Sequence, residues 1–293
     1  MQIKALTDKV HVVSGGVNVG IVKIDDNKVV LIDSGFDSRF GMRLLEMLDN
    51  YGYRVECILN THAHADHMGG NAVIRKSTGC YVLAGKCEVP AIENPIMQAI
   101  ALFGGSPIPE LLNPMMFAEP CKAEPLETEC LKFGNTEIKV IDLPGHSIDQ
   151  KGFLVDGVAF LADSVFSAAA ILKHRLIYLY DPLLHIKTCQ ELKTLKADWY
   201  VGGHIAPVTN IAVLIAENLG HTQAAMNYLK GILQVPQSLD RLIKTFFSHF
   251  MIKQNGWQHF LYRATLNGYL SALKRSDSAD FKIMDNLLIW YAI

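Results

Sequence analysis

The chain has 293 residues and a hydrophobic content of 50%, which is enough for one substantial core plus a small appendage and excludes low-complexity disorder. Its formal net charge of −2 argues against a globally basic nucleic-acid binder. The N-terminus has no uninterrupted apolar run behind a basic start, and no stretch approaches the roughly 20 apolar residues that span a bilayer. We therefore expect a soluble cytoplasmic protein without a membrane partner.

The first third of the chain reads as short strands followed by a β-α-β passage. Apolar runs separated by turn residues predict the strands, and apolar residues at helical spacing predict the helices. In chain order, the predicted elements are strands at 10–14, 17–25 and 28–33, a helix from 38 to about 51, a strand at 54–60, a helix over roughly 70–77 and a strand at 80–84. This succession is typical of an α/β core.

The segment 88–130 interrupts the succession of predicted strands and helices, with several prolines around an apolar stretch at 96–103. We interpret it as a lid-like insertion, in which Met97, Phe103 and Met115 are candidates for a pocket wall. The elements predicted after it are strands at 136–143, 152–155 and 158–162, a helix near 183–195, a strand at 199–202, and a helix from about 208 to 233. Together these elements predict a catalytic domain over residues 1–234.

The remaining residues, 235–293, differ in character from the main body. Two helix-like segments at 239–250 and 257–274 precede a terminal β-hairpin formed by 280–285 and 287–293. This pattern predicts a small, mostly helical C-terminal domain.

The strongest chemical signal is the run from His62 to His67, which follows a predicted strand. In an extended loop, side chains two residues apart point the same way, so His62 and His64 can converge on one metal ion while Asp66 and His67 turn toward a second. A lone histidine usually lies in a solvated polar loop. Three histidines and an aspartate within six residues favour a metal site instead.

A metal site needs further ligands, and suitable residues occur downstream in one recurring context. His146, Asp163 and His204 each follow a short apolar strand directly. Open α/β architectures place functional loops at such strand ends. Their recurrence indicates that these residues join the first cluster.

Four ordered motifs, T-H-A-H-A-D-H-M-G-G-N, L-P-G-H-S, F-L-A-D-S and G-G-H, resemble those of the metallo-β-lactamase-fold hydrolases over roughly residues 10–230. The resemblance implies an α/β fold of the αββα sandwich type. It implies a first metal on His62, His64 and His146, a second on Asp66, His67 and His204, and Asp163 as the bridge. Leu31-Ile32-Asp33-Ser34-Gly35 resembles the family's first motif, which gives Asp33 a supporting role behind the ligands. A simple turn residue is the alternative for Asp33.

Two metal ions a few ångströms apart would make hydroxide available near neutral pH, and Asp66 would position it for attack on an acyl or phosphoryl centre. The cofactor prediction is therefore two divalent ions per chain. Zinc is favoured by imidazole and carboxylate ligands without thiolates, and iron or manganese accept the same ligands.

Departures from individual branches of the family narrow the expected substrate. Asp163 stands where some true β-lactamases carry a cysteine ligand, so antibiotic hydrolysis is not the expected activity. Phe166 replaces a tyrosine typical of quorum-signal lactonases. The motif run closely resembles that of glyoxalase II enzymes, but residues 164–171 lack their glutathione-contacting lysine. We predict cleavage of a small-molecule ester, thioester or lactone, with the substrate-binding residues left open.

The C-terminal segment 235–293 is similar to the winged-helix appendages of some hydrolases of this fold, including endoribonuclease-like members. Its seven basic residues against four acidic ones give too weak a footprint to favour nucleic acid. Two alternatives stay open: an RNA nuclease or phosphodiesterase using the same two metals, and a mononuclear iron persulfide dioxygenase. The expected partner is a small-molecule substrate, and a homodimer is possible.

Overall fold

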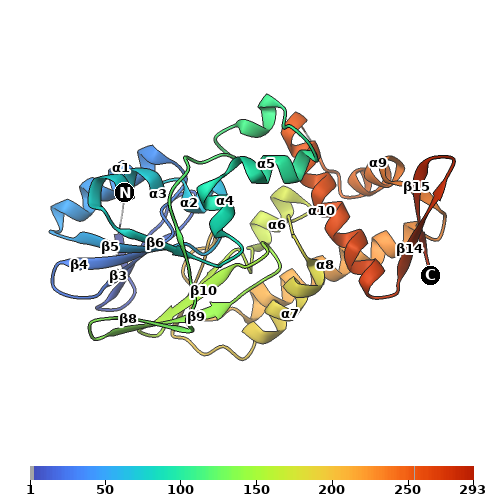
Figure 1. Ribbon diagram of the computed structural model, residues 1–293. Coiled ribbons are helices and arrows are strands. Elements are labelled where there is room, and N and C mark those ends of the chain that lie inside the picture. The colour runs from blue at the N-terminus through green and yellow to red at the C-terminus, as the bar shows by residue number, and fades with distance from the viewer. Residues whose placement is uncertain (1–2, 254) are drawn as a thin grey trace.

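The computed structural model describes residues 3–253 and 255–293, and these form two packed β-sheets flanked by helices, with a helical extension at the C-terminal end (Figure 1). The 7-stranded sheet has the order β1-β2-β3-β4-β5-β6-β7, and the 5-stranded sheet has the order β12-β11-β10-β9-β8. The strands of the first sheet are β1 (Ile3–Ala5), β2 (Val10–Val13), β3 (Val19–Lys23), β4 (Lys28–Ile32), β5 (Arg54–Leu59), β6 (Tyr81–Ala84) and β7 (Glu124–Pro125). Those of the second are β8 (Cys130–Phe133), β9 (Thr136–Asp142), β10 (Lys151–Val155), β11 (Val158–Ala162) and β12 (Trp199–Gly202).

The alternation of side chains along the strands explains why the sheets are covered on both faces. In β4, Val30 and Ile32 point into the cluster between the sheets, whereas Val29 and Leu31 point into a cluster on the outer face. The outer cluster of the first sheet includes residues of α1 (Ser38–Asn50) and α3 (Asn71–Thr78). The outer cluster of the second sheet includes residues of α7 (Pro182–Leu192) and α8 (Ala212–Ile232). The layers are therefore α, β, β and α, which confirms the predicted fold class.

The C-terminal residues form a smaller unit beside the sandwich, around a hydrophobic cluster of their own and of α8. Its elements are α9 (Leu239–His249), α10 (Gly256–Arg275) and a 3-stranded sheet of order β13-β15-β14, with bounds β13 Gln237–Ser238, β14 Ala279–Met284 and β15 Leu287–Ala292. Helix α8 contributes Ala225, Met226 and Leu229 to the same cluster. The division at residue 235 stays a prediction, because α8 on one side of it shares this core with α9 and α10 on the other.

Helix α10 lies against the main body rather than apart from it (Figure 1). It runs beside α5 (Ile96–Phe103) and the short 3-10 helix η1 (Pro109–Leu112). The ring centroids of Phe103 in α5 and Phe260 in α10 lie 5.3 Å apart. At its other end, the Arg275 guanidinium donates to Asp181 Oδ1 at 2.7 Å, and Asp181 caps the start of α7. These contacts join the C-terminal elements to both the insertion and the sandwich.

The structure adds elements that the sequence patterns did not indicate. The insertion contains α4 (Val89–Glu93), α5, η1 and β7, and its ends reach the core through buried Ile92 and Cys121. A helix absent from the prediction, α6 (Ala168–His174), follows the loop after β11. Within residues 3–253 and 255–293, no helix combines the length and the apolar character needed to cross a membrane.

Candidate metal centre

The predicted ligands meet at one rim of the sandwich, where strands of both sheets end. His62 and His64 follow β5, and α2 (Ala65–Met68) carries Asp66 and His67 immediately after them. From the second sheet, His146 follows β9, Asp163 follows β11 and His204 follows β12. Because β4 and β5 are parallel, as are β11 and β12, their carboxyl ends bring these loops to the same edge.

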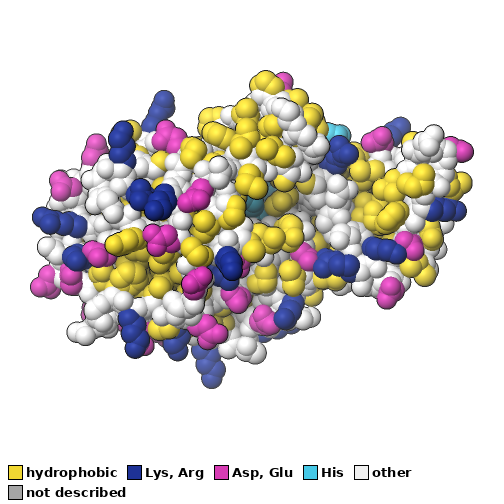
Figure 2. Space-filling view, in the orientation of Figure 1, with side chains coloured by type: hydrophobic (Ala, Val, Ile, Leu, Met, Phe, Trp, Pro, Cys, Tyr) yellow, Lys and Arg dark blue, Asp and Glu magenta, His cyan; other side chains and the backbone are white. Residues whose placement is uncertain are grey.

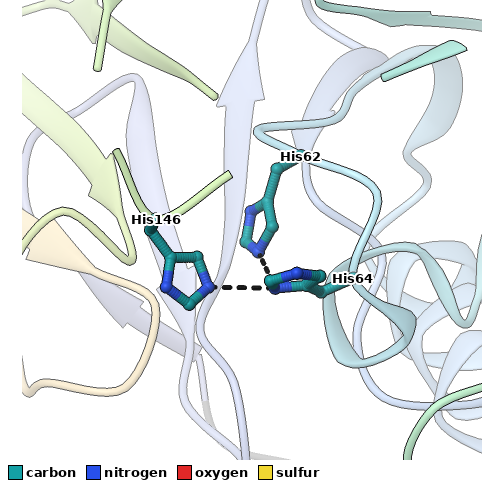
Figure 3. A group of neighbouring side chains, drawn as sticks. All are labelled: His62, His64 and His146. Carbon is teal, nitrogen blue, oxygen red and sulfur yellow. Dashed lines mark hydrogen bonds between the residues drawn. The ribbon is translucent and has the colours of Figure 1, made fainter. Parts of the chain in front are cut away.

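Three histidines form the first group of converging side chains (Figure 3). His64 Nδ1 lies 2.9 Å from His62 Nε2 and 2.9 Å from His146 Nε2. The two outer rings are fixed from behind: His146 Nδ1 donates to the Tyr178 carbonyl at 3.0 Å, and His62 Nδ1 lies 3.0 Å from the Thr61 hydroxyl. In His62 and His146 these contacts place the proton on Nδ1, so the Nε2 lone pair of each ring faces the centre, as a metal ligand requires.

The second group consists of Asp66, His67 and His204. The His204 Nε2 atom lies 3.2 Å from Asp66 Oδ2, and the His67 Nε2 atom lies 3.9 Å from the same oxygen. His204 Nδ1 donates to the Gly16 carbonyl at 2.7 Å, so its Nε2 again faces inward. Unlike the extended loop expected from sequence, α2 makes a single helical turn here, with His64 as its N-cap. That turn points two consecutive side chains, Asp66 and His67, at one point.

Asp163 lies between the two groups. Its Oδ2 atom is 3.5 Å from His146 Nε2 and 3.4 Å from His204 Nε2, and its Oδ1 atom is 3.5 Å from His67 Nε2. A Cβ atom on Gly203 would overlap Oδ1, so glycine at that position leaves room for the carboxylate. The structure thus brings all seven predicted ligands together, with the aspartate facing both sets.

Asp33 lies directly behind the ligands. Its Oδ2 atom accepts a hydrogen bond from His67 Nδ1 at 2.7 Å, and the same carboxylate accepts from the Thr61 hydroxyl and, at 2.8 Å, from the Thr61 backbone N–H. Thr61 in turn contacts His62. One buried carboxylate therefore orients a histidine of each group, which is the usual arrangement behind metal-binding imidazoles.

Electrostatics divide the histidines into two classes. Burial lowers the pKa of His62, His64 and His146, that of His146 to about 3, so these rings are neutral donors of lone pairs. The charge of Asp163 raises the pKa of His204 to about 10. Burial alone would lower the pKa of His67, but the carboxylates of Asp163 and Asp33 outweigh it and raise the value. The carboxylates therefore favour a positive charge among the ligands of the second group.

A divalent cation would supply this positive charge better than protons do. Among the residues that the structure describes, the buried atoms His67 Nε2 and Asp163 Oδ1 find no hydrogen-bond partner and approach each other only as a long ion pair of 3.5 Å. Unpaired buried polar atoms are costly and call for an explanation. An ion coordinated by both atoms would remove the cost, so the residues present fit a metal.

Two residues near the centre were missed by sequence reasoning. The edge of the Tyr178 ring meets His64 and His146 at centroid distances of 5.6 and 5.7 Å, and burial raises the pKa of its hydroxyl to about 12. Glu88, only 4% exposed, lies in the turn before α4 and accepts from the Ala63 N–H at 3.0 Å. Its other oxygen accepts from the Ser147 hydroxyl at 2.7 Å. Glu88 therefore ties the loop of His62 and His64 to the loop of His146.

Comparison with known proteins agrees with this geometry. The family model described as the metallo-beta-lactamase superfamily matches residues 13–204, which include all seven converging side chains and Asp33. The chain belongs to the metallo-beta-lactamase superfamily. Membership and the His/Asp cluster together imply divalent-metal binding.

Several relatives within the superfamily share part or most of the chain. A hydroxyacylglutathione hydrolase of Methylococcus capsulatus is 26% identical over 156 residues, which are 49% of this chain and 50% of that protein. Another of the same name, from Vibrio campbellii, is 26% identical over 239 residues, 78% of this chain and 81% of its own. The chain thus spans about half the length of the first of these curated relatives.

Solved structures extend the likeness in fold to nearly the whole chain. A metallo-beta-lactamase family protein from Thermus thermophilus superposes with a TM-score of 0.76 at 20% identity, covering 99% of this chain and 100% of that one. A beta-lactamase domain protein from Burkholderia ambifaria gives a TM-score of 0.78 at 16% identity, with coverage of 99% and 94%. At these identities the likeness concerns the fold alone.

Glu88 provides a test of how this superfamily member positions its first three histidines. We expect Glu88→Gln to weaken zinc binding by roughly 10–100-fold, because an amide cannot accept hydrogen bonds at both of its terminal atoms and the two loops lose their tie. The measurement is competition for zinc against a chromophoric chelator. Glu119→Gln, which removes the same charge from an exposed site, is the control. Equal zinc affinity in both variants would refute the positioning role.

Proposed function

We propose that this protein is a metal-dependent hydrolase with a dinuclear centre. In the proposal, His62, His64 and His146 hold one divalent ion, Asp66, His67 and His204 hold the other, and Asp163 bridges them. The observation that supports it most is the place of the Asp163 carboxylate, 3.4 to 3.5 Å from histidines of both groups. Zinc is the proposed metal, because the ligand set has no thiolate, and iron or manganese would accept the same atoms.

When bound, such a pair of ions supplies an acidified water as nucleophile and polarises the acyl oxygen of the substrate. The chain's own residues divide the remaining work. Asp66 is at the open side, with a side chain 25% exposed, and is placed to orient the nucleophile and accept its proton. Asp33, through His67 and Thr61, keeps the rings in position while substrate enters and leaves.

The proposed substrate is a small ester, thioester or lactone with an apolar portion. Exposed hydrophobic side chains of the insertion are Ile96, Met97, Ile100, Leu112 and Met115. Figure 2 shows hydrophobic side chains gathered over this part of the surface, next to a recess in which a histidine is visible. Apolar walls with a few convergent polar groups are typical of small-molecule sites. The relatives named hydroxyacylglutathione hydrolase favour an acyl bond as the bond that is cleaved.

The position of α10 weighs against the RNA alternative. A winged-helix domain reads nucleic acid by inserting an exposed helix into a groove. Here α10 is packed against α5, η1 and α7, and Tyr262 donates from this helix to the His174 carbonyl at 3.2 Å. The helix thus supports the walls around the centre, which fits a structural or substrate-covering role.

The experiment is a substrate panel applied to one preparation of the full chain as purified, with its metal content measured by mass spectrometry. We expect turnover of simple thioesters, esters or lactones, and no cleavage of short RNAs or of bis(p-nitrophenyl) phosphate. Cleavage of RNA without acyl hydrolysis would replace the proposal with the nuclease alternative. Oxygen uptake with a persulfide, together with one iron per chain, would replace it with the dioxygenase alternative.

A further inference from the structure

His204 is the most exposed of the three converging side chains in the second group. Its side chain is 30% exposed, whereas that of His67 is fully buried. A buried carboxylate, that of Asp33, holds His67 from behind, but His204 Nδ1 donates to a backbone carbonyl, that of Gly16. The orientation of His204 therefore depends on how firmly the segments around it and behind it are held.

The segment that carries His204 has little stiffness of its own. Gly202 and Gly203 precede the histidine directly, and glycine is the residue with the greatest backbone freedom. Gly203 cannot be exchanged for a stiffer residue, because a Cβ atom at this position would overlap the Asp163 carboxylate. The ligand therefore needs a tie to another part of the fold.

Asn18, in the loop between β2 and β3, supplies that tie. Its side-chain amide donates to the carbonyl of Gly202 at 2.8 Å and to that of Ile205 at 2.6 Å. Its backbone N–H donates to the carbonyl of Gly203 at 2.8 Å. A single residue thus binds three carbonyls on both sides of His204, and its primary amide provides the two side-chain donors that this requires.

The loop that contains Asn18, residues 14–18, is itself anchored in the first sheet. The side chain of Val17 is buried, and the hairpin of β2 and β3 is paired up to the ends of the loop. His204, in contrast, follows β12 of the second sheet. The loop therefore ties an exposed ligand carried by one sheet to the edge of the other sheet.

We propose that Asn18 is a positioning residue for His204 and, through it, for the ion of the second group; the inference rests on the dinuclear centre proposed above. Loss of the Asn18 amide should loosen the second ion and spare the first. This selectivity separates a positioning role from a general contribution to folding, which would affect both ions. Among the hydrogen bonds of the described residues, none joins the loop 14–18 to the ligands of the first group, His62, His64 and His146.

The test is Asn18→Leu, which keeps the approximate size of the side chain and removes both of its donors. The purified full chain is dialysed against increasing concentrations of a chelator, and the ions left per chain are counted by mass spectrometry. Relative to wild type, the variant should release one ion at a roughly 10–100-fold lower chelator concentration and the other at an unchanged concentration. Asn27→Leu, in the exposed turn between β3 and β4, is the control and should release both ions like wild type.

The outcomes for the inference and for the centre differ. Release of both ions from Asn18→Leu at wild-type chelator concentrations would overturn the inference and leave the dinuclear centre standing. An equal weakening of both ions would do the same, because it is the signature of a general structural role. Wild type that carries one ion at full activity would instead overturn the dinuclear centre, and the inference with it.

A measurement on wild type alone guards against a variant that fails to fold. Because coupling is reciprocal, an ion whose binding depends on Asn18 must also hold Asn18 in place. The Asn18 amide, which donates to the Gly203 carbonyl, should exchange its hydrogen faster in protein stripped of one ion than in protein with two. An exchange rate that is the same in both forms would show that Asn18 does not position the ligand.

Discussion

Asp163→Ala should leave the protein with no more than one divalent ion per chain and lower kcat for its acyl substrate by roughly 10³-fold or more. The physical reason is that one carboxylate faces both ligand groups, with oxygens 3.4 to 3.5 Å from histidines of each. Its removal withdraws a ligand from two ions and the negative charge that offsets them. Metal content by mass spectrometry and steady-state kinetics on one preparation measure both effects.

The matched control is Asp26→Ala, which removes a carboxylate from an exposed turn far along the sheet from the centre. It should keep full metal content and full activity. If Asp163→Ala also retained two ions and wild-type kcat, the bridging role would be wrong.

Removal of the metal by a chelator should abolish activity and lower the unfolding temperature by roughly 10 °C, because ligand present at about a thousand times its Kd stabilises by about 4 kcal/mol. Without an ion, the carboxylates around the second group raise the pKa of His67 and His204, so protons replace the charge of the metal and hold the centre only through long ion pairs. Scanning calorimetry before and after addition of zinc measures the shift. Activity that survives complete chelation would contradict metal dependence.

The ligand positions were predictable because their signals are local. His62, His64, Asp66 and His67 fall within six consecutive residues, and the remaining ligands follow the strands β9, β11 and β12. The αββα order was implied by the resemblance, and the consecutive apolar residues of strands such as β4 agree with it, because they require cover on both faces of the sheet. The ordering of motifs along the chain identified the family before any geometry was known.

The parts that escaped prediction depend on contacts distant in sequence. Glu88 belongs to no sequence motif. Its role depends on its hydrogen bonds with Ala63 and Ser147, which lie in two separate loops. The two-residue strand β7 is defined by its parallel pairing with β6, which lies about forty residues earlier in the chain. Helix α6 did carry a local signal, a Ser167 N-cap followed by three alanines.

The packing of α10 likewise could not be read from its sequence. The sequence does not specify which segment the helix contacts, and the structure gives Phe103 of the insertion as one contact of Phe260. The C-terminal region is thereby tied to the walls of the centre. This tie makes a small-molecule hydrolase a better proposal than a nuclease.

The central claim, a dinuclear centre that hydrolyses an acyl bond, is tested most directly by counting metal ions in active wild-type protein. Mass spectrometry of a preparation with measured acyl hydrolase activity should give two divalent ions per chain, with zinc predominant. One ion per chain at full activity would contradict the account.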